Sequence, residues 1–275
     1  MVMIGETLIR QFARLMERED HIPLLEAALM IAQTEYPGLD LPAQLRRFDD
    51  LARRLHVSPD YPPHANIHAL NRLLFEEESF SGNEQDYDNP RNSFLNDVLD
   101  RRKGIPITLS LIYVELGRRR GLPLEGVGFP GHFLAKYSVG CSDILLDPFH
   151  RGEILTMRDC AALLKRHFGP DAEVRPEYLA PSSSRQILGR MLNNLKGAYF
   201  RRHDYARVLT LVEMSLALDP ASHQDVHDRA TVLLLLRRYG EAAADLRAYL
   251  NLAPPGDPQF QSASAMLHRI RSLMN

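Results

Sequence analysis

The chain has 275 residues, of which 45% are hydrophobic and 25% charged, and its formal net charge is −2. This length and composition are typical of one large or two ordinary globular domains and exclude a chain that is disordered throughout. The near balance of charge gives no overall field that favours nucleic acid or an anionic membrane, so we expect neither as a partner. The first ten residues lack the pattern of a secretion signal, and no apolar run is long enough to span a bilayer. We therefore expect a cytoplasmic protein.

Residues 1–75 are predicted to form an N-terminal helical region packed on the domain that follows. Apolar residues recur at helical spacing from Glu6 to about Leu55, which indicates two or three helices. Another helix is expected from Ile67 to about Glu76. The stretch Glu76 to Pro90 then holds six carboxylates among Ser, Gly and Asn. That composition favours an exposed loop, with or without a function.

Residues 76–180 combine helical and strand patterns and are predicted to form an α+β core. Ser93 is expected to cap a helix that stops at Gly104. Pro106 then starts a second helix, which is apolar on most faces and should be buried. After Gly121 the apolar period changes from helical to alternating. The expected strands are Leu124–Phe129, His132–Tyr137 and Ile144–Phe149.

Residues 185–275 are predicted to be entirely helical and carry an internal repeat of 34 residues. The residues that recur at this interval are Tyr205 with Tyr239, Leu216 with Leu250, Leu218 with Leu252, and Pro220 with Pro254. A helix pair with this period resembles the tetratricopeptide repeat (TPR). Two repeats fit, Ile187–Pro220 and Ala221–Pro254, followed by a closing helix, Pro258–Met274.

The middle of the chain places a buried helix, then His132, then Asp147, in the order used by papain-like and transglutaminase-like enzymes. There a Cys at the helix N-terminus is the nucleophile, the His is its base, and the Asp fixes the tautomer of the His. By that resemblance the nucleophile should fall near Pro106. The chain has no Cys between Met1 and Val139. Because Pro offers neither a nucleophile nor an amide hydrogen, conventional thiol chemistry is not expected.

Several alternatives stay open at this point. A shift of two or four residues would bring Thr108 or Ser110 near the site, where a His-Asp pair activates a hydroxyl. Cys141 is expected in a hairpin loop as an incidental thiol, and Cys160 is expected to pack inward as a small apolar residue. His132 and Asp147 can each also be structural, the His through a hydrogen bond and the Asp through an Asp-Pro turn.

Residues 73–152 resemble the bacterial SirB-type transglutaminase-like family that carries tetratricopeptide repeats. The resemblance rests on the strings Asp86-Tyr87-Asp88-Asn89-Pro90-Arg91-Asn92-Ser93, Arg101-Arg102-Lys103-Gly104-Ile105-Pro106-Ile107-Thr108, Phe129-Pro130-Gly131-His132-Phe133 and Leu146-Asp147-Pro148-Phe149, and on Asn96. It implies an α+β core similar to that of transglutaminases, and a loose association with regulation of virulence genes. Asn92, Asn96 and Arg102 are then expected to line the pocket with His132 and Asp147.

Two classes of function follow from these patterns. The first is a non-enzymatic adaptor or regulator that binds a protein or peptide in the groove of the repeats and can form a homodimer. The second is an amide-bond hydrolase or acyltransferase that uses Thr108, Ser110 or a water with His132 and Asp147. A metal-dependent hydrolase that draws on His132 and on carboxylates of the loop Glu76 to Asp88 is a weaker third, because the loop lacks the ligand spacing of a calcium site. We expect no cofactor and no metal site.

Overall fold

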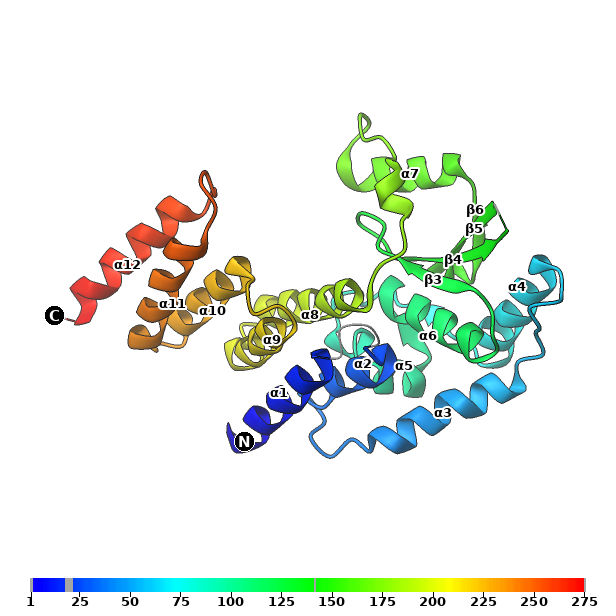
Figure 1. The fold of residues 1–275 in the computed structure, drawn as a ribbon, viewed down its shortest axis with the longest axis horizontal. Coiled ribbons are helices and arrows are strands. Elements are labelled where there is room, and N and C mark those ends of the chain that lie inside the picture. Colours follow the sequence, from blue (N-terminus) through cyan, green and yellow to red (C-terminus); the bar gives the residue numbers. More distant parts are fainter. Residues whose placement is uncertain (1, 18–21, 141, 275) are drawn as a thin grey trace. The chain divides into compact units, whose positions relative to one another are not determined.

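The computed structural model describes residues 2–17, 22–140 and 142–274 (Figure 1). Two compact units emerge from its contacts: residues 23–191, and residues 1–22 together with 192–275. Each is described here by itself. These units do not coincide with the ranges 1–75, 76–180 and 185–275 predicted from the sequence, because residues 1–22 group with the C-terminal helices and residues 23–75 with the core.

The larger unit begins with helices that contact the α+β core. They are α2 (Leu24–Ala32), α3 (Leu41–Arg54), α4 (Pro63–Asn71) and the π-helix η1 (Arg72–Glu77). Helix α3 starts where Asp40 accepts a hydrogen bond from the amide of Ala43, and it packs on α2 and α6.

The acidic stretch after η1 is only partly the exposed loop that composition predicts. Residues 84–88 are exposed, but Phe80 and Asn83 are buried. The short strand β1 (Ser81–Gly82) pairs in parallel with β2 (Lys103–Gly104). A backbone ladder therefore fixes the start of this stretch, which polar composition alone does not reveal.

One helix connects the two strands of this ladder, and a second helix follows the ladder and leads to the sheet. Ser93 does not cap the first of them, α5 (Leu95–Arg101), because Ser93 follows the 3-10 turn η2 (Pro90–Asn92) and Phe94 holds the capping position. The helix ends at Arg102 in the left-handed conformation, two residues before the predicted Gly104. Helix α6 (Pro106–Arg119) has Pro106 in its first turn and is buried along most of its length, as predicted.

A four-stranded antiparallel sheet in the order β3-β4-β5-β6 forms the rest of the core. Its strands are β3 (Leu124–Val127), β4 (Leu134–Val139), β5 (Ser142–Asp147) and β6 (Glu153–Leu155). Strand β6 was not predicted, and β4 begins two residues after His132, so His132 lies in the preceding turn and not on the strand. Helix α6 contacts β3 and β4, while α7 (Met157–Phe168) lies on the other side of the sheet (Figure 1).

The smaller unit is an array of helices that pack on their neighbours in the chain. It contains the end of α8 (Ser184–Arg201), then α9 (Tyr205–Leu218), α10 (His223–Leu235), α11 (Tyr239–Leu252) and α12 (Phe260–Met274). The turns inside the two pairs match, since His203 and Arg237, 34 residues apart, have φ of 57° and 59°. Helix α1 (Val2–Met16) packs against α9, a contact that differs from the predicted packing of the whole 1–75 region on the core.

This arrangement confirms the predicted fold class, an α+β core followed by an all-α array. Within the described residues, every helix is too short or too polar to cross a bilayer.

Candidate functional site

The register of the sheet brings His132 to Asp147. Ala135 on β4 lies opposite Leu146 on β5, so Asp147 at the end of β5 lies beside the residues that precede β4. The Nε2 atom of His132 is 2.9 Å from Oδ2 of Asp147, and the two side chains are buried. The other ring nitrogen of His132, Nδ1, has no hydrogen-bond partner in the described part of the chain. The pair therefore has the geometry of an oriented imidazole with one free nitrogen.

The carboxylate of Asp147 is held from both sides. Its Oδ1 accepts hydrogen bonds from the amides of Phe149, at 3.0 Å, and His150, at 3.4 Å. Burial raises the pKa of Asp147, but the hydrogen bonds and charges of His132 and His150 outweigh burial and hold that pKa below its usual value. Asp147 therefore stays ionised at neutral pH.

His150 is a member of the site that the sequence patterns did not single out. Its Nδ1 is 2.7 Å from Oδ2 of Asp147, the same oxygen that contacts His132. The two imidazole rings lie 6.0 Å apart between centroids and are stacked at 23°. The 3-10 turn η3 (Pro148–His150) turns the chain back so that a residue three positions after Asp147 reaches its carboxylate. The sequence signal for His150 is its position three residues after Asp147, in the string Asp147-Pro148-Phe149-His150.

The hydroxyl of Thr108, a candidate nucleophile, is engaged in the start of α6. It accepts a hydrogen bond from the amide of Ile105 at 3.1 Å and lies 2.8 Å from the carbonyl of Asn92, to which it donates. The hydroxyl of Ser110 donates to the carbonyl of Phe133 at 3.1 Å. Neither hydroxyl contacts His132 in the residues that the structure describes.

The three predicted binding residues do not converge on His132. Asn92 donates to the carbonyls of Asp86 and Tyr87, so it fixes the exposed loop 84–88. Arg102 pairs with Glu78 and lies over the ring of Phe80. The side chain of Asn96 is buried, and its Oδ1 has no hydrogen-bond partner within the described ranges.

The loop 84–88 borders the His132 site through two contacts. The ring of Tyr87 meets the ring of Phe149 edge-on at 6.2 Å, and Phe149 in turn meets His132 at 5.9 Å. An oxygen of Glu84 lies 3.8 Å from Nε2 of His150. Asn92 is therefore linked to this site through the loop with which it forms hydrogen bonds.

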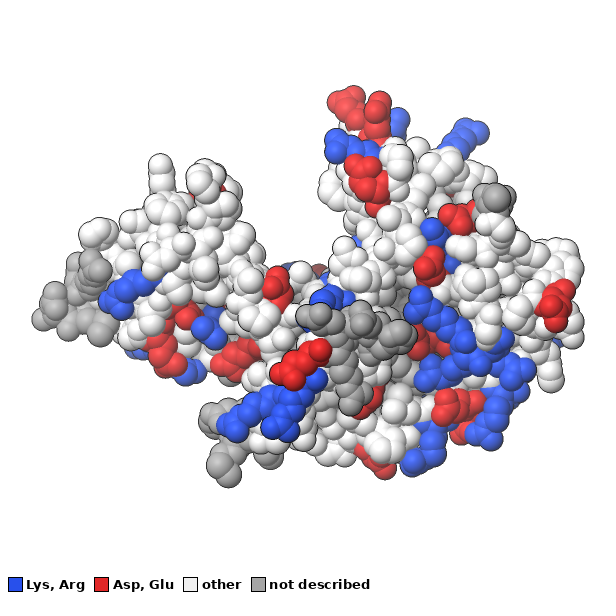
Figure 2. Space-filling view, viewed as in Figure 1, with Lys and Arg blue, Asp and Glu red and all other residues white. Residues whose placement is uncertain are grey.

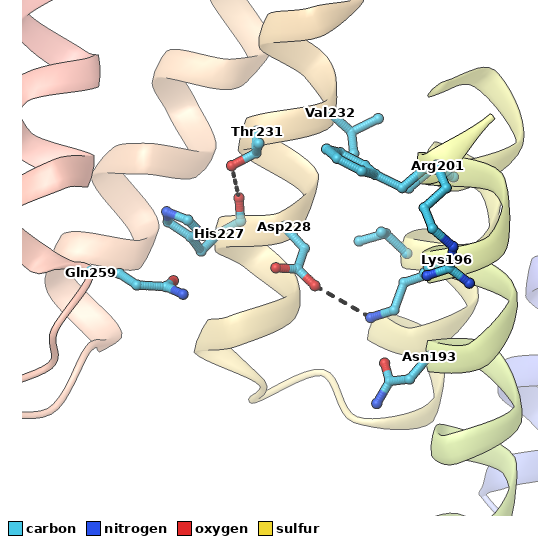
Figure 3. A pocket seen from close by; sticks show the side chains of 12 residues that line it. Asn193, Lys196, Arg201, His227, Asp228, Thr231, Val232 and Gln259 are labelled. Atoms are coloured by element: carbon cyan, nitrogen blue, oxygen red, sulfur yellow. Dashed lines mark hydrogen bonds and ion pairs between the residues drawn. The ribbon is translucent and has the colours of Figure 1, made fainter. Parts of the chain in front are cut away.

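A second candidate site is a cavity of about 440 Å³ in the helical array (Figure 3). Side chains from α8 and α10 face each other across it, and Gln259 lies at its edge. Val208, Val212 and Val232 supply apolar lining, while Phe200 is 44% exposed at the rim.

The charges of this cavity are largely paired. The ammonium group of Lys196 lies 2.6 Å from Asp225 and 3.4 Å from Asp228, and Figure 3 shows it directed toward α10. His227 has its pKa lowered because burial disfavours its charged form. Its Nε2 is buried without a hydrogen-bond partner among the residues described.

Comparison with known families agrees with this architecture. A family model described as the transglutaminase-like superfamily matches residues 42–193, more than half of the chain. The chain belongs to the transglutaminase-like superfamily. A second model, described as the tetratricopeptide repeat, matches residues 195–275. The predicted order of a transglutaminase-like domain followed by TPR helices is thereby confirmed.

Relatives match along the chain to different extents. A UPF0162 protein of Xylella fastidiosa (strain Temecula1) is 36% identical over 262 residues, which cover 92% of each chain. A UPF0162 protein of Vibrio cholerae is 32% identical over 247 residues, covering 87% of this chain and 89% of that one. F-box only protein 21 of Homo sapiens is 32% identical over 183 residues, covering 62% of this chain and 27% of that one.

The position of one cysteine of the transglutaminase-like domain, Cys160, and the start of α6 bear on thiol chemistry. Pro106 occupies the first turn of α6, near which the resemblance predicted a nucleophile. Cys160 on α7 is buried against Phe129, Leu134 and other apolar side chains, and burial raises the pKa of its thiol. Cys141 lies outside the described residues.

The surface of the transglutaminase-like domain carries a group of basic residues, several of which are paired with carboxylates. Arg53 and Arg54 of α3 pair with Asp50 and Glu78, and Arg119 of α6 pairs with Asp49. Figure 2 shows acidic side chains among the basic ones on this face. The pairing reduces the field that a polyanion would meet.

Proposed function

We propose that this protein is a non-enzymatic adaptor or regulator that holds a segment of a partner protein in the TPR cavity. The observation that carries the proposal is the cavity of about 440 Å³ between α8 and α10, in a helical array of a family whose concave surfaces serve protein interaction. Its volume suits one or two side chains of a bound segment.

The lining sets the chemistry of that segment. The apolar wall of Val208, Val212 and Val232, with the exposed ring of Phe200, suits one bulky apolar side chain. Asn193, Thr231 and Gln259 add amide and hydroxyl groups at the same cavity, which suit the backbone of an extended or helical peptide. Lys196 is already neutralised by two carboxylates, so charge is not the main attraction.

The state of the transglutaminase-like domain supports a non-catalytic role. Pro106 lies near the position at which the resemblance predicts a thiol, and Cys160 is buried in the core. The hydroxyls of Thr108 and Ser110 are used by backbone groups. The start of α6 thus carries no Cys, and its two candidate hydroxyls are both engaged with backbone groups.

The proposal includes several finer points. The protein acts in the cytoplasm, belongs to the SirB-type branch, binds neither nucleic acid nor membrane, and can pair with a second copy of itself. The paired surface charges and the low net charge support the exclusion of nucleic acid.

Site-specific photo-crosslinking in cells tests the adaptor role. A benzophenone side chain in place of Phe200 probes the cavity rim, and the same group in place of Tyr61, which is 54% exposed in the transglutaminase-like domain, is the matched control. We expect a discrete adduct with another protein at position 200 that is absent at position 61. Identical adducts at both positions, or none at position 200, would contradict the proposal.

A second function is favoured by one observation, the His132–Asp147 pair with a free Nδ1. In this alternative the imidazole takes a proton from a water that attacks the carbonyl carbon of an amide, and returns that proton to the leaving nitrogen as the C–N bond breaks, which gives a carboxylic acid and an amine; the hydroxyl of Thr108 is engaged elsewhere. The test compares peptides from cells that contain wild type or His132→Gln by mass spectrometry. An amide substrate that accumulates only with His132→Gln would support hydrolysis, and identical peptide profiles would contradict it.

A further inference from the structure

Three metal-ligating side chains of the transglutaminase-like domain converge on one point. One ligand atom from each of His132, Asp147 and His150 lies within 4.8 Å of the others. Nε2 of His132 and Nδ1 of His150 both contact Oδ2 of Asp147, at 2.9 and 2.7 Å. Two imidazole nitrogens are therefore gathered at one carboxylate oxygen.

We propose that His132, Asp147 and His150 form a binding site for a divalent first-row transition-metal ion such as zinc. Imidazole nitrogen with one carboxylate oxygen is a ligand set that such ions prefer, whereas calcium and magnesium favour oxygen alone. Bonds of about 2.0–2.2 Å in a tetrahedral site place ligand atoms about 3.3–3.5 Å apart. To bind the ion, each imidazole nitrogen gives up its contact with Oδ2, separates from it by about 0.4–0.8 Å and turns its lone pair toward the ion.

Groups around these three side chains hold them in place, as residues behind the ligands do in known metal sites. The amides of Phe149 and His150 hold Oδ1 of Asp147, which leaves Oδ2 directed at the two imidazoles. Nε2 of His150 lies 3.8 Å from an oxygen of Glu84, which is too long for a hydrogen bond but places a carboxylate beside the outer nitrogen of this ligand. The ring of Phe149 packs edge-on against both imidazoles and forms an apolar wall.

Access comes through His150, whose side chain is 40% exposed while His132 and Asp147 are buried. Three protein ligands leave at least one coordination position for water or another ligand. The site departs from the sequence-based expectation of no metal. The sequence analysis paired His132 with Asp147 but did not single out His150, which supplies the third ligand atom.

Calorimetric titration of zinc into tag-free, EDTA-treated full-length protein tests the site. His150→Ala removes one ligand, and His150→Gln removes it while keeping a polar side chain. His68→Ala removes an exposed imidazole on α4 and is the matched control. We expect one zinc per chain in wild type and His68→Ala, with binding more than about tenfold weaker in both His150 variants, because loss of even an outer partner costs 10–100-fold.

Cobalt substitution identifies the ligand atoms. Bound cobalt should give a visible absorption band without the near-ultraviolet thiolate band, and the band should be lost in the His150 variants while their far-ultraviolet circular dichroism matches wild type. The proposal is overturned by absence of stoichiometric zinc binding in wild type, by unchanged affinity in the folded His150 variants, or by a thiolate band. Failure of the site leaves the TPR proposal standing, since that cavity shares none of these residues.

Discussion

Gly152→Ala should destabilise the transglutaminase-like domain far more than an ordinary glycine substitution. Gly152 has φ of 73°, and a Cβ built there lies 2.0 Å from Oδ1 of Asn71. Asn71 donates to the carbonyl of Gly152 and accepts from the hydroxyl of the buried Tyr113, each at 3.0 Å. The amide of Gly152 also donates to the carbonyl of Asp147, so the turn that carries His150 depends on this position.

The magnitude follows from three contributions. A left-handed alanine costs about 1 kcal/mol. Displacing Asn71 loses two hydrogen bonds of about 1 kcal/mol each and leaves the Tyr113 hydroxyl buried without a partner, for about 1 kcal/mol more. The total is about 4 kcal/mol. Gly140→Ala, with φ of 59° and no atom within 4 Å of the added Cβ, carries only the first contribution.

Hydrogen exchange measured by mass spectrometry on peptides from α6 and β4 gives the local free energy of opening for each variant. A double-mutant cycle isolates the clash: in an Asn71→Ala background, Gly152→Ala should cost only about 1 kcal/mol. The reasoning fails if Gly152→Ala and Gly140→Ala differ by less than about 1 kcal/mol, or if the cycle shows no coupling.

Two further predictions concern the helical array. Arg229→Ala breaks a bidentate pair with the buried Asp245, whose two contacts are 2.7 and 2.8 Å long. Once the partial exposure of Arg229 is discounted, the free energy of unfolding in urea should fall by about 2 kcal/mol. A fall no larger than that caused by Arg238→Ala, at an exposed position, would count against this prediction. Burial lowers the pKa of His227, so the unfolded chain binds more protons and stability falls as pH drops below about 6.5. His227→Leu should therefore lose less stability than wild type between pH 7.5 and 5.5, and equal losses in the two proteins would show that His227 is not responsible.

Local sequence signals predicted the helices that carry the site more accurately than they predicted the side-chain contacts within it. Pro106 and the apolar run after it located α6, because helix starts and burial depend on neighbouring residues. The 34-residue repeat located the array for the same reason. The prediction that Ser93 caps α5 was wrong, since a 3-10 turn precedes α5 and Phe94 holds the capping position.

Long-range contacts account for what the sequence did not predict. Thr108 donates a hydrogen bond to the carbonyl of Asn92, and Asn92 donates one to the carbonyl of Tyr87 in the loop that borders the His132 site. Such roles depend on tertiary packing and leave no periodic signal. His150 was different, because its three-residue spacing from Asp147 was visible in the sequence.

Quantitative affinity capture from an extract of the native cells tests partner binding in the TPR cavity most directly. Phe200→Ser removes an exposed ring at the cavity, and Leu252→Ser removes an exposed apolar side chain elsewhere in the same array. Burying the phenyl ring against a partner is worth about 1.5–3 kcal/mol, so Phe200→Ser should weaken capture by about tenfold to a hundredfold. We predict this loss in Phe200→Ser with Leu252→Ser and His132→Ala unchanged. A partner retained by Phe200→Ser and lost in His132→Ala would contradict the adaptor role and place the function at the His132 site.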